Sequence, residues 1–138
     1  MNQSSYTSKL VFTSLLCLFL SHFCLAQVSK KTYQTIIANN TEIVRIDVGD
    51  AKLELKETKG TRILVETAIK LSVPNEALLD FVIKNGRYKL IQTKDESTRT
   101  LYLEVKKDKN IILVKGKTCA ESVVYTIYVP PAIKVIKE

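Results

Sequence analysis

Apolar and charged residues alternate with a period of two along most of this chain, and this pattern limits the fold more than any other feature. One run places Val44, Ile46 and Val48 on one side and Arg45 and Asp47 on the other. Successive side chains of a β-strand point to opposite faces of its sheet, so each run predicts a strand with one buried and one solvated face. The pattern is typical of antiparallel strands packed on one side.

Short polar segments separate the alternating runs. Gly49-Asp50 joins two runs across only two residues and predicts a tight hairpin, and residues 58–61 and 107–110 predict two further turns. We therefore predict an all-β fold of roughly eight to ten strands, arranged as an antiparallel β-sandwich or a solenoid-like roll. The residues expected to face inward are Val44, Ile46, Leu53, Leu55, Ile63, Val65, Ile69, Leu103, Val105, Ile127 and Val129.

One segment, at about residues 74–84, departs from this alternation. It places Leu78, Phe81 and Val82 at the spacing i, i+3, i+4, which predicts one face of a helix. Pro74 suits a first helical turn, and the Lys-Asn-Gly sequence at 84–86 is typical of a helix end. We predict one short helix here, with its apolar stripe covering an open end or face of the sheet.

Residues 1–26 have the organisation of a secretory signal peptide. A polar opening with one positive charge, Lys9, precedes an apolar run of eleven residues, 10–20, and a tail that ends in Ala26. A membrane anchor is the alternative, but the run is about half the ~20 apolar residues that a span needs. We expect cleavage after Ala26 and a single β-rich domain at 27–138, with no stable membrane span. The predicted location is the periplasm, the cell surface or the extracellular space.

The composition of residues 27–138 excludes several kinds of site. Removing residues 1–26 removes the only histidine, His22, and leaves Cys119 as the one cysteine. Without histidine there is no Ser-His-Asp or Cys-His arrangement, and zinc loses its usual nitrogen ligand. Cys119 has no base beside it in the sequence, and we interpret it as a half-buried or incidental thiol in a turn. We expect no intramolecular disulfide and a domain held together by packing alone.

Acidic residues are the remaining candidates for catalysis or metal binding. The close pairs Asp47 with Asp50 and Asp95 with Glu96 could support carboxylate-dependent hydrolysis of glycosides. With Glu54, the first pair could also supply oxygen ligands to calcium, although the spacing matches no calcium-binding motif. We interpret these residues as solvated acids at turns and strand edges. No catalytic, cofactor-binding or metal-binding residue is predicted, and no cofactor.

The basic residues exceed the acidic ones by a modest margin. Residues 27–138 contain 20 basic and 14 acidic groups, and the lysines 106, 107, 109, 115 and 117 form a cationic stretch interrupted by Asp108. Four tyrosines could alternate with these lysines as stacking platforms for bases, namely Tyr88, Tyr102, Tyr125 and Tyr128. Lysines on outer strand faces more often keep sheets soluble and protect their edges. We expect no nucleic-acid binding.

Several segments together resemble a known family. Residues 43–56 followed by 62–67 resemble the opening of an adhesin family of bacterial exported proteins, the DUF4097 type, in which a strand leads through a hairpin into a second strand. Residues 75–83, 88–93 and 124–130 are similar to later parts of that family's leading module. Family members usually continue into glycine-punctuated strands thought to stack as a solenoid, whereas this chain ends at Glu138 and shows no internal repeat. The resemblance implies an exported structural or interaction domain.

Two functional hypotheses follow. The first is a secreted or cell-envelope adhesin-like interaction domain without catalytic activity, and the alternative is a carboxylate-dependent hydrolase acting on envelope polysaccharide. For the first, we expect a protein or surface-polymer partner at the edge of the last strand, residues 132–138, where unpaired backbone groups can accept an added strand. Alternatively, the charges of Lys134 and Lys137 protect this edge against the addition of another strand.

Overall fold

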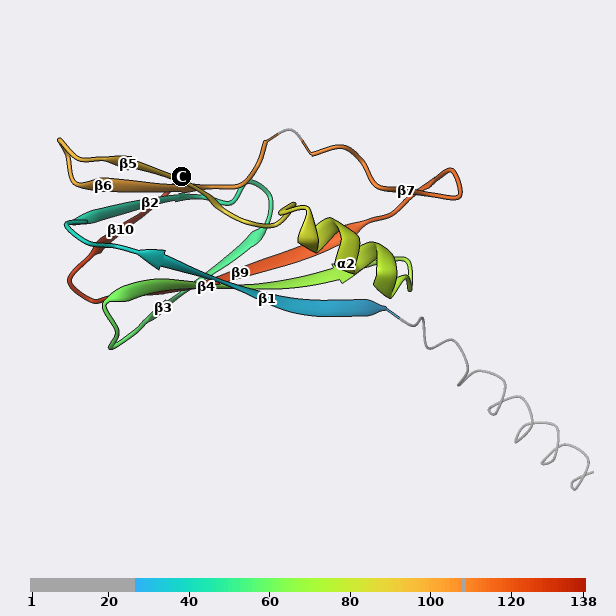
Figure 1. Ribbon diagram of the computed structural model, residues 1–138, viewed down its shortest axis with the longest axis horizontal. Helices are drawn as coiled ribbons and strands as arrows, with labels where there is room; N and C mark the ends of the chain where they lie inside the picture. Colours follow the sequence, from blue (N-terminus) through green and yellow to red (C-terminus); the bar gives the residue numbers. More distant parts are fainter. Residues whose placement is uncertain (1–26, 108) are drawn as a thin grey trace, which may run out of the picture.

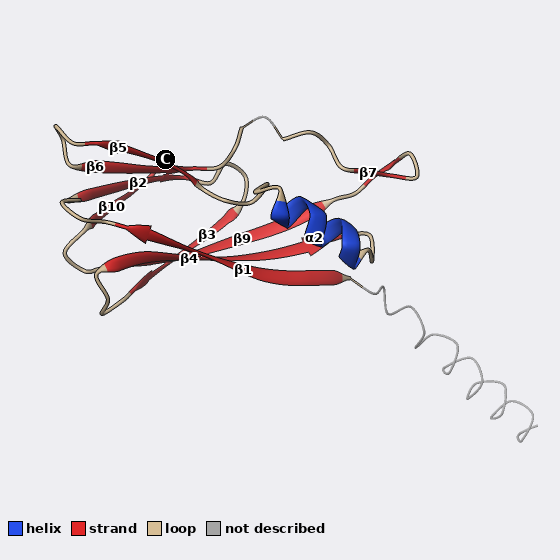
Figure 2. Cartoon of the chain, viewed as in Figure 1, coloured by secondary structure: helices blue, strands red, loops and turns tan. Residues whose placement is uncertain are grey.

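The computed structural model describes residues 27–107 and 109–138. This part of the chain forms two four-stranded sheets that face each other, one helix and a small two-stranded sheet (Figure 1). Strands make up most of the regular structure (Figure 2). The predicted all-β class with one short helix is therefore confirmed. The predicted signal peptide lies outside the described residues.

The first sheet has the strand order β1-β4-β9-β3 and the second has the order β10-β2-β6-β5. The strands of the first sheet are β1 (Val28–Ile37), β4 (Arg62–Leu71), β9 (Glu121–Val129) and β3 (Lys52–Glu57). Those of the second sheet are β10 (Lys134–Lys137), β2 (Ile43–Asp47), β6 (Thr100–Glu104) and β5 (Ile91–Asp95). The two-stranded sheet pairs β7 (Leu113–Val114) with β8 (Lys117–Thr118).

Strand pairing is mixed, whereas the sequence predicts antiparallel strands only. The pairs β1–β4, β4–β9 and β5–β6 are antiparallel, but β3–β9, β2–β6 and β10–β2 are parallel. Gly49-Asp50 does not close a hairpin, because β2 and β3 belong to different sheets and this turn crosses between them. Residues 58–61 also join strands that are not neighbours, since β9 lies between β3 and β4. Alternation reports which face of a strand is buried and carries no information about the neighbouring strand.

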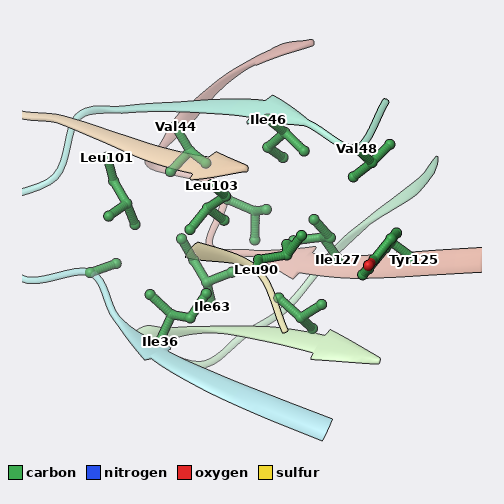
Figure 3. Packing of buried hydrophobic residues seen from close by; sticks show 13 residues of the cluster. Ile36, Val44, Ile46, Val48, Ile63, Leu90, Leu101, Leu103, Tyr125 and Ile127 are labelled. Carbon is green, nitrogen blue, oxygen red and sulfur yellow. The ribbon is translucent and has the colours of Figure 1, made fainter. Parts of the chain in front are cut away.

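The hydrophobic core lies between the two sheets (Figure 3). Most residues predicted to face inward are buried there, and Ile69 is buried in a second cluster described below. Leu53 and Leu55 are only partly buried because β3 is an edge strand, and Val105 because it follows the last residue of β6. The buried members of the core are Ile36, Ala38, Val44, Ile46, Val48, Ile63, Val65, Leu90, Leu101, Leu103, Tyr125, Ile127 and Val129.

The helix, α2 (Glu76–Lys84), is shorter than predicted, and its packed face contains Leu78 and Val82 as predicted but Leu79 instead of Phe81. Asn75 is its N-cap, and its Oδ1 accepts a hydrogen bond of 2.9 Å from the backbone N–H of Leu78. Pro74 therefore precedes the cap and does not form the first turn. Leu79 and Val82 are the buried residues of the helix, whereas Phe81 is 63% exposed and does not belong to the buried stripe as predicted.

Leu79 and Val82 belong to a second apolar cluster at one end of the first sheet. Its other buried members are Ile69, Leu71, Tyr88, Ile112 and Cys119. Cys119 is only 3% exposed, so the thiol is buried more deeply than its predicted position in a turn suggests. The helix thus covers the part of the first sheet that extends beyond the second, as the apolar stripe predicts.

One side of the sandwich is closed by the segment between α2 and β5. Leu90 reaches the core from this segment. The side-chain amide of Gln34 on β1 donates a hydrogen bond to the carbonyl of Leu90 and accepts one from its N–H, both at 3.0 Å. The edges of β1 and β5 are thereby joined. The opposite side of the sandwich, between the edges of β3 and β10, has no such segment among the described residues.

Candidate functional site

A groove of about 270 Å³ runs between the edge strands β3 and β10, on the side of the sandwich that no segment covers. Leu55 lines it from β3, and Ile133 and Val135 line it from the segment that contains β10. These side chains are partly buried and pack against the core. The complete lining is Leu55, Lys56, Glu57, Val129, Pro130, Pro131, Ile133 and Val135. Six of these eight lining residues are apolar and two, Lys56 and Glu57, are charged, so the groove presents both polar and apolar surface at the opening between the sheets.

The backbone of β10 is hydrogen-bonded on one side only. Lys134 N–H donates to the carbonyl of Glu42, and Glu138 N–H donates to that of Ile46, each at 2.9 Å. Because alternate residues of a parallel strand point their N–H groups to opposite sides, those of Val135 and Lys137 point away from β2. In the described residues no other strand pairs with that side of β10. The free edge predicted for the last strand is therefore observed.

Charged residues flank this edge. Lys134 is exposed, and Lys137 is paired in register with the inward-facing Ile46. Arg45 on β2 forms an ion pair of 2.5 Å with Glu138, which holds the end of β10 to its neighbour. A charge on an edge strand discourages unspecific pairing with other sheets. The free edge of β10 therefore carries unpaired backbone groups together with two exposed lysines.

A second hollow, a cleft of about 850 Å³, lies where β2 crosses to β3. Three carboxylates line it, from Asp47, Asp50 and Glu121, and four lysines surround them, Lys52, Lys106, Lys107 and Lys109. Lys107 Nζ lies 3.7 Å from Asp47 Oδ2, and Asp47 Oδ1 accepts a hydrogen bond of 2.9 Å from Gly49 N–H. The cleft is thus lined by charges of both signs.

Glu121 is held in a network at the inner wall of this cleft. Arg87 binds it with two hydrogen bonds, from Nε to Oε1 at 2.7 Å and from Nη2 to Oε2 at 2.6 Å. The Tyr88 hydroxyl donates to Oε1 at 2.6 Å, and Arg87 Nη2 also donates to the carbonyl of Asn110 at 2.8 Å. The network ties the segment after α2 to β9 and to the loop that follows β6.

Burial and hydrogen bonding act in opposite directions on Glu121. Burial raises the pKa of its carboxyl, but the hydrogen bonds from Arg87 and Tyr88, together with the charges of Arg87 and Lys109, outweigh burial and lower the pKa overall. The pKa of the Tyr88 hydroxyl is raised, mainly by burial and to a smaller extent by its hydrogen bond to Glu121. Burial lowers the pKa of Lys109, whose Nζ lies 5.7 Å from the centre of the Tyr88 ring. Glu121 is therefore a fixed anion and not a proton donor near neutral pH.

The other acidic candidates lie apart from this network. Asp95 is the last residue of β5, at the start of the turn to β6, and hydrogen bonds from Ser97, the larger cause, and from Thr98 lower the pKa of its carboxyl. Glu96 pairs with Lys94 at 2.8 Å in the same turn. Asp47, Asp50 and Glu54 do not converge, since the described residues contain no group of three or more acidic, cysteine or histidine side chains able to hold a metal ion.

The tyrosines do not form an exposed stacking surface. Tyr88 and Tyr125 are buried, and the Tyr125 hydroxyl donates to the carbonyl of Tyr88 at 3.1 Å. Tyr128 is partly buried on the outer face of the first sheet, with Lys56 Nζ 5.6 Å from its ring centre. No helix among the described residues has the length and apolar character needed to cross a membrane.

The sequence-based prediction located the edge of the last strand but missed both hollows. Leu55 and Val135 line one groove although 80 positions separate them, and Arg87 and Glu121 are 34 positions apart. The sequence did contain one signal for the second pair. Glu121 is the first residue of β9, at an alternating position shared with the inward-facing Val123, Tyr125 and Ile127, and it is paired in register with Leu71. A charge at an inward position requires a partner of opposite sign.

Comparison with known proteins finds no family model, no curated protein and no solved structure that matches the chain.

Proposed function

We propose that this protein is an exported, non-catalytic interaction domain of the adhesin-like kind, and that it binds an extended segment of a partner protein at the edge of β10. One observation carries the proposal. The free edge of β10 borders a groove between the two sheets, where Leu55, Ile133 and Val135 offer apolar side chains. The resemblance of the strand sequences to an exported adhesin family supports the same class of function.

An added strand would use both parts of this site. Its backbone would pair with the unbonded N–H groups of Val135 and Lys137, which supplies affinity without regard to sequence. Every second side chain would point between the sheets, where Leu55, Ile133 and Val135 provide apolar contacts. The partner segment is therefore expected to alternate apolar residues with polar ones.

The positive charges beside β10 also limit which partner segments can bind. Lys134 and Lys137 lie at the edge, and they would repel a basic segment and attract an acidic one. We expect a partner whose alternate residues are apolar and whose remaining residues are acidic.

A proline substitution at Val135 tests whether its backbone N–H is needed for strand addition. Val135→Pro removes an N–H that points away from β2, so the sandwich should keep its fold while strand addition is blocked. Val135→Ala is the matched control, because it shortens the same side chain and keeps the N–H. In cells that make the protein, a photo-crosslinking residue at Lys137 is expected to give a discrete protein adduct that Val135→Pro abolishes and Val135→Ala only weakens.

The same variants test whether the partner is a second copy of the chain. Light scattering after size-exclusion chromatography should then show a concentration-dependent dimer that is lost only with Val135→Pro. Monomers at all concentrations, together with an adduct that is equally strong in both variants, would contradict strand addition.

A second candidate function, carboxylate-dependent hydrolysis of envelope polysaccharide, is favoured by one observation. Asp47, Asp50 and Glu121 line the same cleft. The lowered pKa of Glu121 argues against it as the general acid, because that role needs a raised pKa. A glycan-hydrolysis screen distinguishes the two functions: turnover that Asp47→Asn or Asp50→Asn abolishes would establish the hydrolase and displace the binding proposal.

Export is the part of the proposal that can be tested first. The protein recovered outside the cytoplasm is expected to begin at Gln27. Amino-terminal sequencing of the fractionated protein checks this, and a cytosolic protein that retains residues 1–26 would contradict it.

A further inference from the structure

Three of the six large apolar side chains that are exposed in the described residues lie at one end of the molecule. Phe81 on α2 is 63% exposed. Ile111, just before β7, is 71% exposed, and Leu113, in β7, is 64% exposed. Figure 1 shows α2 and β7 at the same end, opposite the turn between β5 and β6. Of the three other exposed side chains, Tyr33 and Ile37 lie on β1 and Ile91 lies on β5.

Phe81, Ile111 and Leu113 are exposed because their neighbours in the sequence are buried and hold the backbone in place. Ile112 is buried in the second cluster with Val82, and its carbonyl accepts a hydrogen bond of 2.8 Å from Cys119 N–H. Because Ile112 points inward from an extended segment, its neighbours Ile111 and Leu113 point outward. On α2 the inward positions are Leu79 and Val82, which leaves Phe81 on the outer side. The fold therefore presents these side chains to solvent at fixed positions.

Basic residues surround the three apolar side chains. Phe81, Lys106, Lys109 and Asn110 line one depression of about 280 Å³, and Asn110 directly precedes Ile111. The stretch 105–119 contains five lysines and a single acid, Asp108. Four exposed lysines lie on α2 and in the segment around β7, namely 84, 106, 115 and 117, whereas Lys107 lies beside Asp47. We name Phe81, Ile111, Leu113 and these four lysines the apolar-basic end.

Two acidic side chains near this end are paired with basic residues that do not belong to it. Glu121 is bound by Arg87 through two hydrogen bonds, and Asp80 on α2 pairs with Lys30 on β1. Lys106, Lys115 and Lys117 form no ion pair with a described residue. The apolar-basic end therefore combines protruding apolar side chains with an excess of lysines.

We propose that the apolar-basic end binds the surface of a bilayer that contains anionic lipids. Phe81, Ile111 and Leu113 enter the boundary between headgroups and acyl chains, and the lysines contact lipid phosphates. The charge pattern favours lipid over a protein partner, because protein interfaces are depleted in lysine whereas membrane-surface sites are rich in it. Figure 1 places β10 away from this end, so membrane binding leaves the strand-addition groove accessible. The inference does not depend on the proposed function.

A single tryptophan tests insertion directly, because the chain contains none. In residues 27–138, which hold every strand of both sheets, Leu113→Trp places the fluorophore at the apolar-basic end. Ile37→Trp is the control, at an equally exposed position on β1. With phosphatidylcholine vesicles containing phosphatidylglycerol, Leu113→Trp is expected to shift its emission to shorter wavelength and to be quenched by brominated lipid. Ile37→Trp is expected to show neither effect. Circular dichroism confirms that both variants are folded.

The charge requirement is tested by vesicle co-sedimentation. Lys106→Gln with Lys117→Gln is expected to weaken binding to anionic vesicles by about 25-fold, about fivefold per lysine removed. Lys59→Gln with Arg62→Gln, which removes two exposed positive charges between β3 and β4, is the matched control and should leave binding nearly unchanged. Absence of binding to anionic vesicles, equal losses in the two double variants, or equal responses of the two tryptophans would overturn the proposal.

Discussion

Glu121 is the residue whose environment departs most from the alternating pattern of the strands. It occupies the inward register of β9, yet it is charged and only 21% of its side chain is exposed. Arg87, 14% exposed, compensates it with two hydrogen bonds, and Tyr88 adds a third. A buried ion pair of this kind costs desolvation, but removing one partner leaves the other charge without compensation.

Glu121→Gln is therefore expected to lower the free energy of unfolding by about 2 kcal/mol at pH 7. Because the folded-state pKa of Glu121 is lowered, its stabilising contribution is complete above the unfolded-state pKa and is lost as the pH falls through the folded-state pKa. The difference between the two proteins should thus shrink below about pH 4.5. Urea unfolding at pH 7 and near pH 3 measures it.

The matched control for this prediction is Glu96→Gln, at an exposed position in the β5–β6 turn. It should change stability by less than about 0.5 kcal/mol at either pH. A Glu121→Gln difference that is the same at both pH values would contradict the electrostatic explanation.

At the scale of elements, α2 shows how packing decides which face of a helix is buried. Leu78, Phe81 and Val82 have helical spacing, but the chain buries Leu79 and Val82 because these face Ile69 and Leu71 on β4. The ion pair between Asp80 and Lys30 fixes the helix over β1. Nine residues are too few for a stable isolated helix, so α2 depends on this contact and on its cap.

Asn75→Ala is expected to destabilise the domain by about 1 kcal/mol, because it removes the side-chain acceptor for Leu78 N–H at the start of α2. Asn75→Asp retains an acceptor and should be close to the unsubstituted protein. Thermal unfolding, monitored by circular dichroism, compares the melting temperatures of the unsubstituted protein and the two variants. Equal melting temperatures for Asn75→Ala and Asn75→Asp would show that the cap does not contribute.

At the scale of the molecule, two sheets and one helix pack together with no disulfide among the described residues. Segment 86–90 and Gln34 close the side between β1 and β5, while the side between β3 and β10 keeps a groove. The only cysteine in residues 27–138, Cys119, is buried in the second cluster. Stability should therefore be independent of the redox conditions.

For residues 27–138 we expect a strand-dominated circular dichroism spectrum and the same melting temperature with and without a thiol reductant. Iodoacetamide should modify Cys119 only slowly in the folded protein and rapidly in denaturant, because the thiol is 3% exposed. A melting temperature that falls on reduction, or rapid modification of the folded protein, would contradict this account of the domain.

The sequence by itself determined which face of each alternating strand points toward the core, because alternation along a strand depends only on the geometry of that strand. Val44, Ile46, Val65 and Ile127 face the core as their spacing predicts. It also indicated one short helix and an edge position for the last strand.

Only the tertiary structure decided which strands are neighbours. Gly49-Asp50 crosses between sheets, and β3 pairs in parallel with β9, because burial of both inner faces outweighs the local preference for a hairpin. The groove between Leu55 and Val135 and the ion pair of Arg87 with Glu121 depend on these pairings. Their residues are distant in the sequence, and no local pattern brings them together.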